Sequence, residues 1–204
     1  MNKTCYLIFS TVLAATGMLV ACQQNTPATP GSNTPATLSA SAPSEYLEFS
    51  TLSELQKHAG FPIWIPGYIP GHLPLYRAWI ARYATGDENV RLLYSEPGNS
   101  LDASLKSLDI QMTRSDEMIT SDSIAHQFRI TPLDVRQIRV RGQSGFTYWA
   151  QSGAAGNSAH LDWREGAFNF SITLYGDWPA PDRANPHALD ALLFKIAASL
   201  QSRG

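Results

Sequence analysis

Apolar and polar residues alternate along several stretches of this chain, and the alternation predicts β-strands. Between residues 108 and 113, three large apolar residues alternate with three polar ones, and the same period of two runs from Phe168 to Leu174. Successive side chains of a strand point to opposite faces, so each stretch would have one apolar and one polar face. This pattern is typical of an antiparallel sheet that is packed on one side and solvated on the other.

Turn-forming residues separate pairs of strand-like runs and predict β-hairpins. The expected hairpins join 75–83 to 90–94, 135–141 to 146–150, and 161–163 to 168–174. The third has the clearest pattern, because Arg164-Glu165-Gly166 separates two alternating runs.

Helix signals lie near both ends of this strand-rich region. Thr51-Leu52-Ser53-Glu54 fits a capping box, and Gly60 offers a C-terminal stop. Near the C-terminus, Asn185 is a good N-cap and Pro186 suits the first helical position. The apolar stripe that follows consists of Leu189, Leu192, Leu193, Ile196 and Leu200. Ser115–Thr131 is expected to be a loop with one helical turn at most.

These elements predict an α+β fold. The expected architecture is a single antiparallel β-sheet of about six to eight strands with an N-terminal and a C-terminal helix packed on its apolar face.

A proline-rich segment, Phe61–Pro74, interrupts the pattern. Its four prolines are incompatible with a helix interior or a central strand, so the segment is expected to be a loop laid over the core. Loops often carry function, and large apolar or amphipathic groups are enriched at the centres of interfaces. Trp64, Tyr68 and Ile69 are therefore candidate interaction residues. The alternative is that they close one end of the core.

The N-terminus has a different pattern, an apolar run after Lys3. From Tyr6 to Ala21 it has only 16 residues, interrupted by polar ones, whereas a spanning helix needs roughly 20. It ends in Leu19-Val20-Ala21-Cys22, which resembles the lipobox of bacterial lipoproteins. The resemblance implies that residues 1–21 are a cleaved signal peptide and that Cys22 is the site of lipid attachment.

Residues 22–45 are rich in Thr, Pro, Ala and Ser, with Asn25–Thr29 repeated as Asn33–Thr37. Without apolar residues to bury, such a segment is expected to be a disordered tether, with a span on the order of 25 Å. The globular domain is then 46–204, which is 159 residues and enough for one core.

Composition narrows the classes of partner and chemistry. Removing residues 1–21 leaves 14 basic against 17 acidic residues, a formal charge of −3, which argues against nucleic-acid binding. The cysteines are Cys5 and Cys22, so the domain has no cysteine for a disulfide or thiolate metal site.

No catalytic residue, metal site or cofactor is predicted. The five histidines lack metal-ligand spacing and are expected at the surface or in loops. Ser144 falls in a hairpin turn, and Asp162 with Glu165 flanks a hairpin tip, where solvated turn residues are expected. Arg139 and Arg141 are expected on one strand face and are candidate contacts for a phosphate, a carboxylate or an acidic partner surface, or simply part of a polar face.

Several short motifs occur together in an order that suggests a family. They are Gly60-Phe61-Pro62, Ile65-Pro66-Gly67-Tyr68-Ile69-Pro70-Gly71, Val90–Tyr94, Val140–Gly145, Leu161–Gly166 and Ile196–Leu200. Over about Leu52–Leu200, the chain resembles an uncharacterised bacterial domain found in lipoproteins and on the outer side of membrane-tethered proteins, some of them anti-sigma-factor-like. No catalytic residue carries over from the resemblance, and the chain is expected to differ from the anti-sigma arrangement in having no cytoplasmic segment with which to hold a sigma factor.

The expected protein is thus an extracytoplasmic lipoprotein, held on the outer face of the cytoplasmic membrane, or in an outer membrane if the cell has one, by the lipid on Cys22. Three functions remain open: a non-enzymatic sensing or protein-interaction module, a carrier of a lipid or other apolar ligand between sheet and helices, and a cell-wall hydrolase. The first is favoured, with an extracytoplasmic protein as partner.

Overall fold

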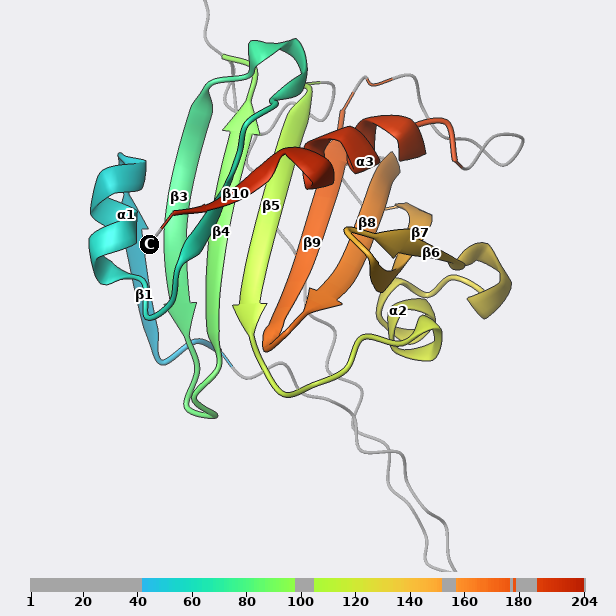
Figure 1. The fold of residues 1–204 in the computed structure, drawn as a ribbon, viewed down its shortest axis with the longest axis horizontal. Coiled ribbons are helices and arrows are strands. Elements are labelled where there is room, and N and C mark those ends of the chain that lie inside the picture. Colours follow the sequence, from blue (N-terminus) through green and yellow to red (C-terminus); the bar gives the residue numbers. More distant parts are fainter. Residues whose placement is uncertain (1–41, 98–104, 152–156, 177, 179–186, 204) are drawn as a thin grey trace, which may run out of the picture. The chain divides into compact units, whose positions relative to one another are not determined.

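The computed structural model describes residues 42–97, 105–151, 157–176, 178 and 187–203, which lie within one unit, Ala40–Gly204. Eight of its strands form an antiparallel main sheet. They are β1 (Glu45–Phe49), β3 (Leu75–Arg82), β4 (Glu88–Ser95), β5 (Ser107–Arg114), β6 (Arg136–Val140), β7 (Gln143–Gln151), β8 (Asn157–Glu165) and β9 (Phe168–Tyr175). Their order across the sheet is β1-β3-β4-β5-β9-β8-β7-β6 (Figure 1).

A second layer lies on one side of the main sheet. It contains β2 (Ile63–Pro66) and β10 (Leu200–Arg203), which pair with each other as a separate antiparallel sheet. Helix α3 (Asp190–Ser199) runs directly into β10 and contacts β8 and β9 (Figure 1). The short 3-10 turn η1 (Pro70–His72) follows β2.

The main core fills the space between these layers. It takes the alternate side chains of the central strands, such as Leu92, Ile110 and Ile172, and the buried face of α3 through Leu193 and Ile196. A smaller core lies on the other side of the sheet, where α2 (Ser121–Phe128) packs Ile124 and Ala125 against β7. The 3-10 turn η2 (Pro132–Asp134) connects α2 to β6.

The expected α+β fold with one sheet covered by two terminal helices was wrong. The domain is mostly β, with a large sheet and a small one, and its first and last described elements are the strands β1 and β10. Helix α1 (Leu52–His58) lies beside β1 and β3 at one edge of the sheet (Figure 1). The second sheet was missed because β2 adjoins prolines and β10 carries mostly polar residues, so neither has an alternating pattern of its own.

The proline-rich segment is also more regular than expected. Its residues Ile63–Pro66 form β2, which is possible because β2 belongs to a sheet of only two strands and its proline stands at the strand end. The segment expected to be a loop between Ser115 and Thr131 contains α2, which Thr120 and Ser123 begin with a reciprocal capping box. The Thr51 cap of α1 is confirmed, since its hydroxyl accepts from the Glu54 amide at 3.2 Å. The expected caps Asn185 and Pro186 lie outside the described residues, and the described helix begins at Asp190.

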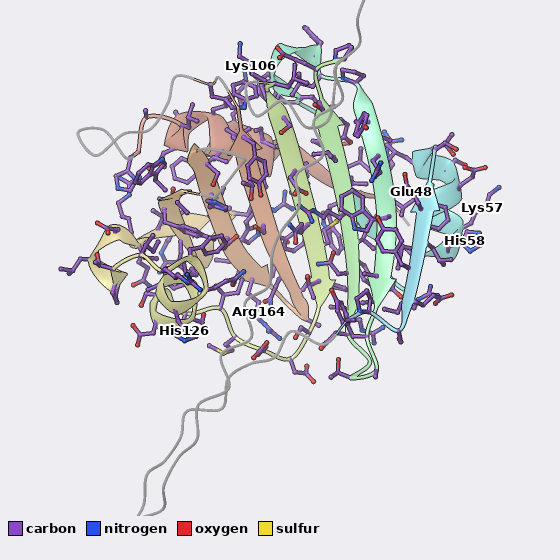
Figure 2. All side chains as sticks on the ribbon, turned by 180° about the vertical axis from the view of Figure 1, so that it is seen from behind. Glu48, Lys57, His58, Lys106, His126 and Arg164 are labelled. Atoms are coloured by element: carbon purple, nitrogen blue, oxygen red, sulfur yellow. The ribbon has the colours of Figure 1, made fainter. Side chains whose placement is uncertain are left out.

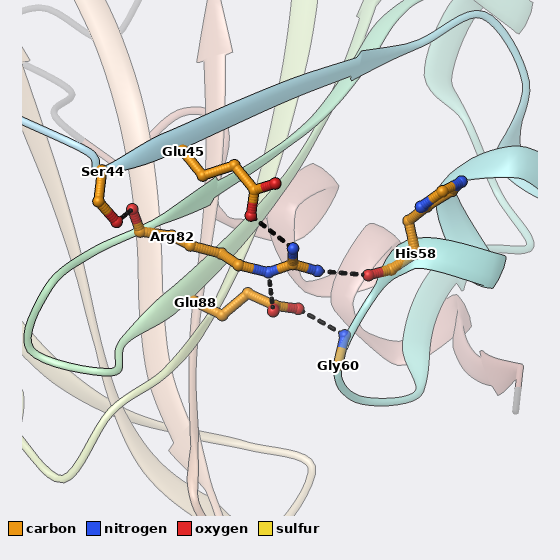
Figure 3. A network of polar contacts seen from close by, with 6 residues as sticks. All are labelled: Ser44, Glu45, His58, Gly60, Arg82 and Glu88. Atoms are coloured by element: carbon orange, nitrogen blue, oxygen red, sulfur yellow. Dashed lines mark hydrogen bonds and ion pairs between the residues drawn. The ribbon is translucent and has the colours of Figure 1, made fainter.

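Arg82 fixes the edge where the chain enters the domain. Its guanidinium donates to Glu45 in β1 at 2.6 Å, to Glu88 in β4 at 2.9 Å and to the carbonyl of His58 at the end of α1 at 2.6 Å (Figure 3). The second oxygen of Glu88 accepts from the Gly60 amide at 2.6 Å. One cation therefore ties two strands of the main sheet to the C-terminus of α1.

Candidate functional site

The side chains of the main sheet that point away from α3 form the surface that we call the polar face. Strand register places the following residues on it: Tyr46, Glu48, Trp79, Arg91, Asp109, Gln111, Ser171, Thr173, Tyr175, His160, Asp162, Arg164, Tyr148, Phe146, Gln137 and Arg139. Figure 2 views the sheet from this side, with Glu48 toward one edge and Arg164 toward the other half. Among the described elements, α2 is the helix that packs on this face.

An arginine and two aromatic rings form the part of the polar face over β1, β3 and β4. The guanidinium of Arg91 lies over the Trp79 ring, with 4.9 Å from Cζ to the ring centroid, and the rings of Tyr46 and Trp79 are 6.4 Å apart. Arg91 Nε donates to both carboxylate oxygens of Asp109, at 2.8 and 2.7 Å. The Asp109 side chain is fully buried, whereas one third of the Arg91 side chain and half of Tyr46 are exposed. We call Tyr46, Trp79, Arg91 and Asp109 the arginine–aromatic cluster.

A second cluster lies beneath α2 and is closed to solvent. The Tyr148 hydroxyl donates to Asp162 at 2.6 Å, and the Tyr148 ring stacks on His160 with centroids 4.6 Å apart. The ring nitrogens of His160 contact the hydroxyls of Ser158 at 2.7 Å and Thr173 at 3.1 Å. Burial lowers the pKa of His160 to about 3, so the imidazole is neutral. These contacts make the cluster a packed polar layer rather than an accessible catalytic centre.

A pocket opens beside α2, on the same face of the sheet. Its volume is about 520 Å³, and its walls come from residues 118–121, from the β6–β7 hairpin and from the end of β8. The lining residues are Met118, Ile119, Thr120, Ser121, Gln137, Gln143, Ser144, Phe146, Trp163, Arg164 and Gly166. Because polar and apolar groups both line it and it faces away from α3, it is not the sheet–helix cavity expected of an apolar-ligand carrier.

The candidate residues of the proline-rich segment pack against the main core. Trp64 lies 5.1 Å from the rings of both Phe168 and Phe170. The ammonium of Lys195 in α3 lies 3.8 Å from the ring centroid of Tyr68. Ile69 is half-buried against the same core. The three are therefore in the second layer, on the opposite side of the sheet from the arginine–aromatic cluster.

Arg139 and Arg141 do not share a strand face. Arg139 belongs to β6, whereas Arg141 lies after its end in a turn, with φ of +50°. The Arg141 side chain donates to Glu165 at 3.0 Å and to the carbonyl of Leu200 at 2.9 Å, so it ties the β6–β7 turn to the junction of α3 and β10. Arg139 donates to the carbonyl of Gly142 at 3.3 Å.

Three other expectations concerned residues whose side chains could in principle take part in catalysis. Asp162 and His160 were expected in solvated positions, and that was wrong, because both are buried in β8. Asp162 and Glu165 point to opposite faces of the sheet and form no carboxylate pair. Ser144 is the second residue of β7, and its hydroxyl accepts from Gln137 at 3.0 Å.

Some expectations lie outside the described residues. The signal peptide 1–21, Cys22 and the tether as far as residue 41 are among them. Within the described ranges, no helix has the length and apolarity required to cross a bilayer, and no group of three or more His, Cys, Asp or Glu side chains could hold a metal ion.

Comparison with known proteins gave no match. No family model, curated protein or solved structure matches this chain.

The arginine–aromatic cluster was not predicted. Its residues occupy the polar positions of strands, with Trp79 between Ala78 and Ile80, and Asp109 between Leu108 and Ile110. A tryptophan at a position expected to face solvent is unusual, whereas an acid there is ordinary, so Trp79 was the residue by which the sequence could have indicated this cluster.

Proposed function

We propose that this chain is a membrane-anchored extracytoplasmic lipoprotein whose folded domain binds an extracytoplasmic protein and is not an enzyme. The lipobox resemblance at Leu19–Cys22 supports the anchoring, and the Thr/Pro/Ala/Ser composition of residues 22–45 supports a tether that lets the domain reach a partner.

The arginine–aromatic cluster is the observation that carries the binding role. Tyr, Trp and Arg are the residues that most often dominate the binding energy of protein interfaces. Here they adjoin on neighbouring strands, with Tyr46 50% exposed and Trp79 and Arg91 half-buried. Asp109 holds the guanidinium through a bidentate contact, so little side-chain entropy remains to be lost when a partner docks.

The test removes the aromatic anchors and leaves the buried ion pair intact. Arg91 is not substituted, because its loss would leave the buried Asp109 carboxylate without a partner and lower stability by itself. The double variant Tyr46→Thr and Trp79→Thr is made in the full-length protein. In intact membranes it should no longer cross-link to the extracytoplasmic protein that the wild type captures. The thermal midpoint should fall by only a few degrees, because neither residue belongs to the main core.

Two control variants separate this surface from others. Leu133→Ser removes an exposed apolar side chain from η2, at a distance in sequence from the cluster, and should leave the captured partner unchanged. Tyr68→Ser tests the proline-rich segment. If Tyr68→Ser abolished capture while the Tyr46 and Trp79 variant did not, the interface would belong to the proline-rich segment and not to the arginine–aromatic cluster.

A further inference from the structure

The pocket beside α2 has the volume of a small-molecule site. Its volume of about 520 Å³ lies within the roughly 300–1,000 Å³ range of ligand pockets. Three segments that are separate in sequence form its walls, namely 118–121, the β6–β7 hairpin and residues 163–166. Its shape therefore depends on the folded sheet and not on one surface loop.

Arg164 holds the wall formed by residues 118–121 in place. Its guanidinium donates to the carbonyl of Glu117 at 2.7 Å and to that of Gly166 at 3.0 Å. Asn169 donates to the same Glu117 carbonyl at 2.9 Å. The segment that leads into α2 is thus tied to the β8–β9 turn, and the pocket keeps its opening.

The charges around the pocket disfavour two classes of ligand, cations and free anions. No carboxylate occurs among its described lining residues, so an amine or a metal cation would find no negatively charged partner there. Among the described lining residues only Arg164 carries a charge, and its guanidinium already donates to backbone carbonyls. A free anion would have to compete with those contacts.

The remaining polar groups are amides and hydroxyls. Gln137, Gln143, Ser121 and Ser144 line the pocket, and each can both donate and accept hydrogen bonds. Gln137 already donates to Ser144, which positions the serine hydroxyl. Such a set matches a ligand whose own groups are neutral and both donate and accept, as sugar hydroxyls and acetamido groups do.

Apolar surface completes the lining. The Phe146 ring is half-buried, and Met118 is 72% exposed at the pocket. One face of a pyranose ring consists of C–H groups, and an aromatic ring with an adaptable thioether suits that face. A wholly apolar ligand would leave the amides and hydroxyls unpaired. We infer that this pocket binds an uncharged, acetamido-bearing saccharide. The inference goes beyond the proposed protein-binding role and does not rest on it.

The probe is the trimer of N-acetylglucosamine, titrated calorimetrically into the full-length protein in detergent micelles. The wild type should bind it. Gln143→Ala should weaken binding by about 3- to 10-fold, as expected for the loss of one neutral hydrogen bond. Ser144→Trp should abolish binding by filling the pocket. Gln127→Ala, an exposed glutamine on α2 that does not line the pocket, is the matched control and should bind as the wild type does.

Two further ligands sharpen the assignment. The glucosamine trimer has the same rings with cationic amines in place of acetamides, and it should bind more weakly because the lining offers no carboxylate. An alanine tripeptide with blocked termini should not compete with the acetylated trimer for the pocket. The inference is overturned if the acetylated trimer gives no binding heat at millimolar concentration, if Ser144→Trp binds it unchanged, or if the tripeptide binds as tightly. The variant with Tyr46→Thr and Trp79→Thr should still bind the trimer, so the two proposals can fail separately.

Discussion

Asp162 shows how a single carboxyl can make the stability of this sheet depend on pH. Its side chain is buried in β8, where one oxygen accepts from the Tyr148 hydroxyl and the other has no partner within hydrogen-bond geometry among the described residues. Burial raises the pKa of Asp162 to about 6. The nearby hydroxyls of Ser171 and Tyr148 lower this pKa and so offset part of the rise. At neutral pH the folded domain therefore holds a buried negative charge at a cost in stability.

The sign of the resulting pH dependence follows from that raised pKa. The ordinary value is 3.8, so between about pH 4 and 6 the folded state binds a proton that the unfolded state does not. The loss of stability caused by the buried Asp162 charge is therefore absent below pH 4 and complete above pH 6. Asp162→Asn removes it, so the free energy of unfolding of the variant minus that of the wild type should increase by on the order of 3 kcal/mol from pH 4 to pH 7.

Urea denaturation of both proteins across that range measures this difference, in which the contributions of titrating groups distant from Asp162 cancel. Asp122→Asn changes an exposed carboxyl on α2 and is the matched control. If the difference in free energy of unfolding between Asp162→Asn and wild type stayed constant with pH, the Asp162 carboxyl would be solvated in the folded protein.

At the scale of elements, the side chains of β9 alternate between the main core and the polar face. Phe170 is 1% exposed, stacks on Trp163 with centroids 4.8 Å apart and meets the edge of Trp64. Its neighbour Ser171 points to the polar face. Phe170→Ala should lower the free energy of unfolding by roughly 3–5 kcal/mol because it leaves a cavity, whereas Ser171→Ala should cost about 1 kcal/mol or less. Chemical denaturation decides this, and equal midpoints for the two variants would contradict the assigned faces.

The elements that could be predicted are those whose pattern is complete in their own sequence. The alternation in β5 and β9 and the turns of the three hairpins each identify a strand without knowledge of its neighbours. β1, β2 and β10 could not be found in this way, because short strands with few apolar residues depend on the partner with which they pair. α2 could have been predicted, since Thr120 and Ser123 carry its capping signal.

The candidate sites depend on register and strand order, which no single stretch contains. Arg91 and Asp109 meet because β4 and β5 pair with a particular register, and Trp79 joins them because β3 follows β4 in the sheet. The pocket needs α2 to lie over β7 while Arg164 reaches Glu117 from β8. Trp64 and Tyr68 could be picked from the sequence as prominent residues, but the sequence alone could not show that they pack on the core.

At the scale of the whole molecule, both proposed binding sites lie on the polar face, and α3, β2 and β10 cover the other face. The two proposed sites would therefore face their partners from the same side of the domain. The proposed lipid anchor and tether would let that side turn toward a protein or a saccharide near the membrane. The placement of the domain near the membrane depends on Cys22 being the anchored residue.

Cys22→Ser tests the anchor directly, because acylation of a lipoprotein requires the cysteine thiol. The wild type should incorporate labelled palmitate and partition into the detergent phase, since two acyl chains at ~0.8 kcal/mol per buried CH₂ hold a protein more firmly than one chain does. The Cys22→Ser protein should take up no label and keep its first 21 residues. Cys5→Ser removes the other cysteine of the chain, which precedes the lipobox, and should label as the wild type does. Equal labelling of Cys22→Ser and wild type would refute lipid attachment at this residue.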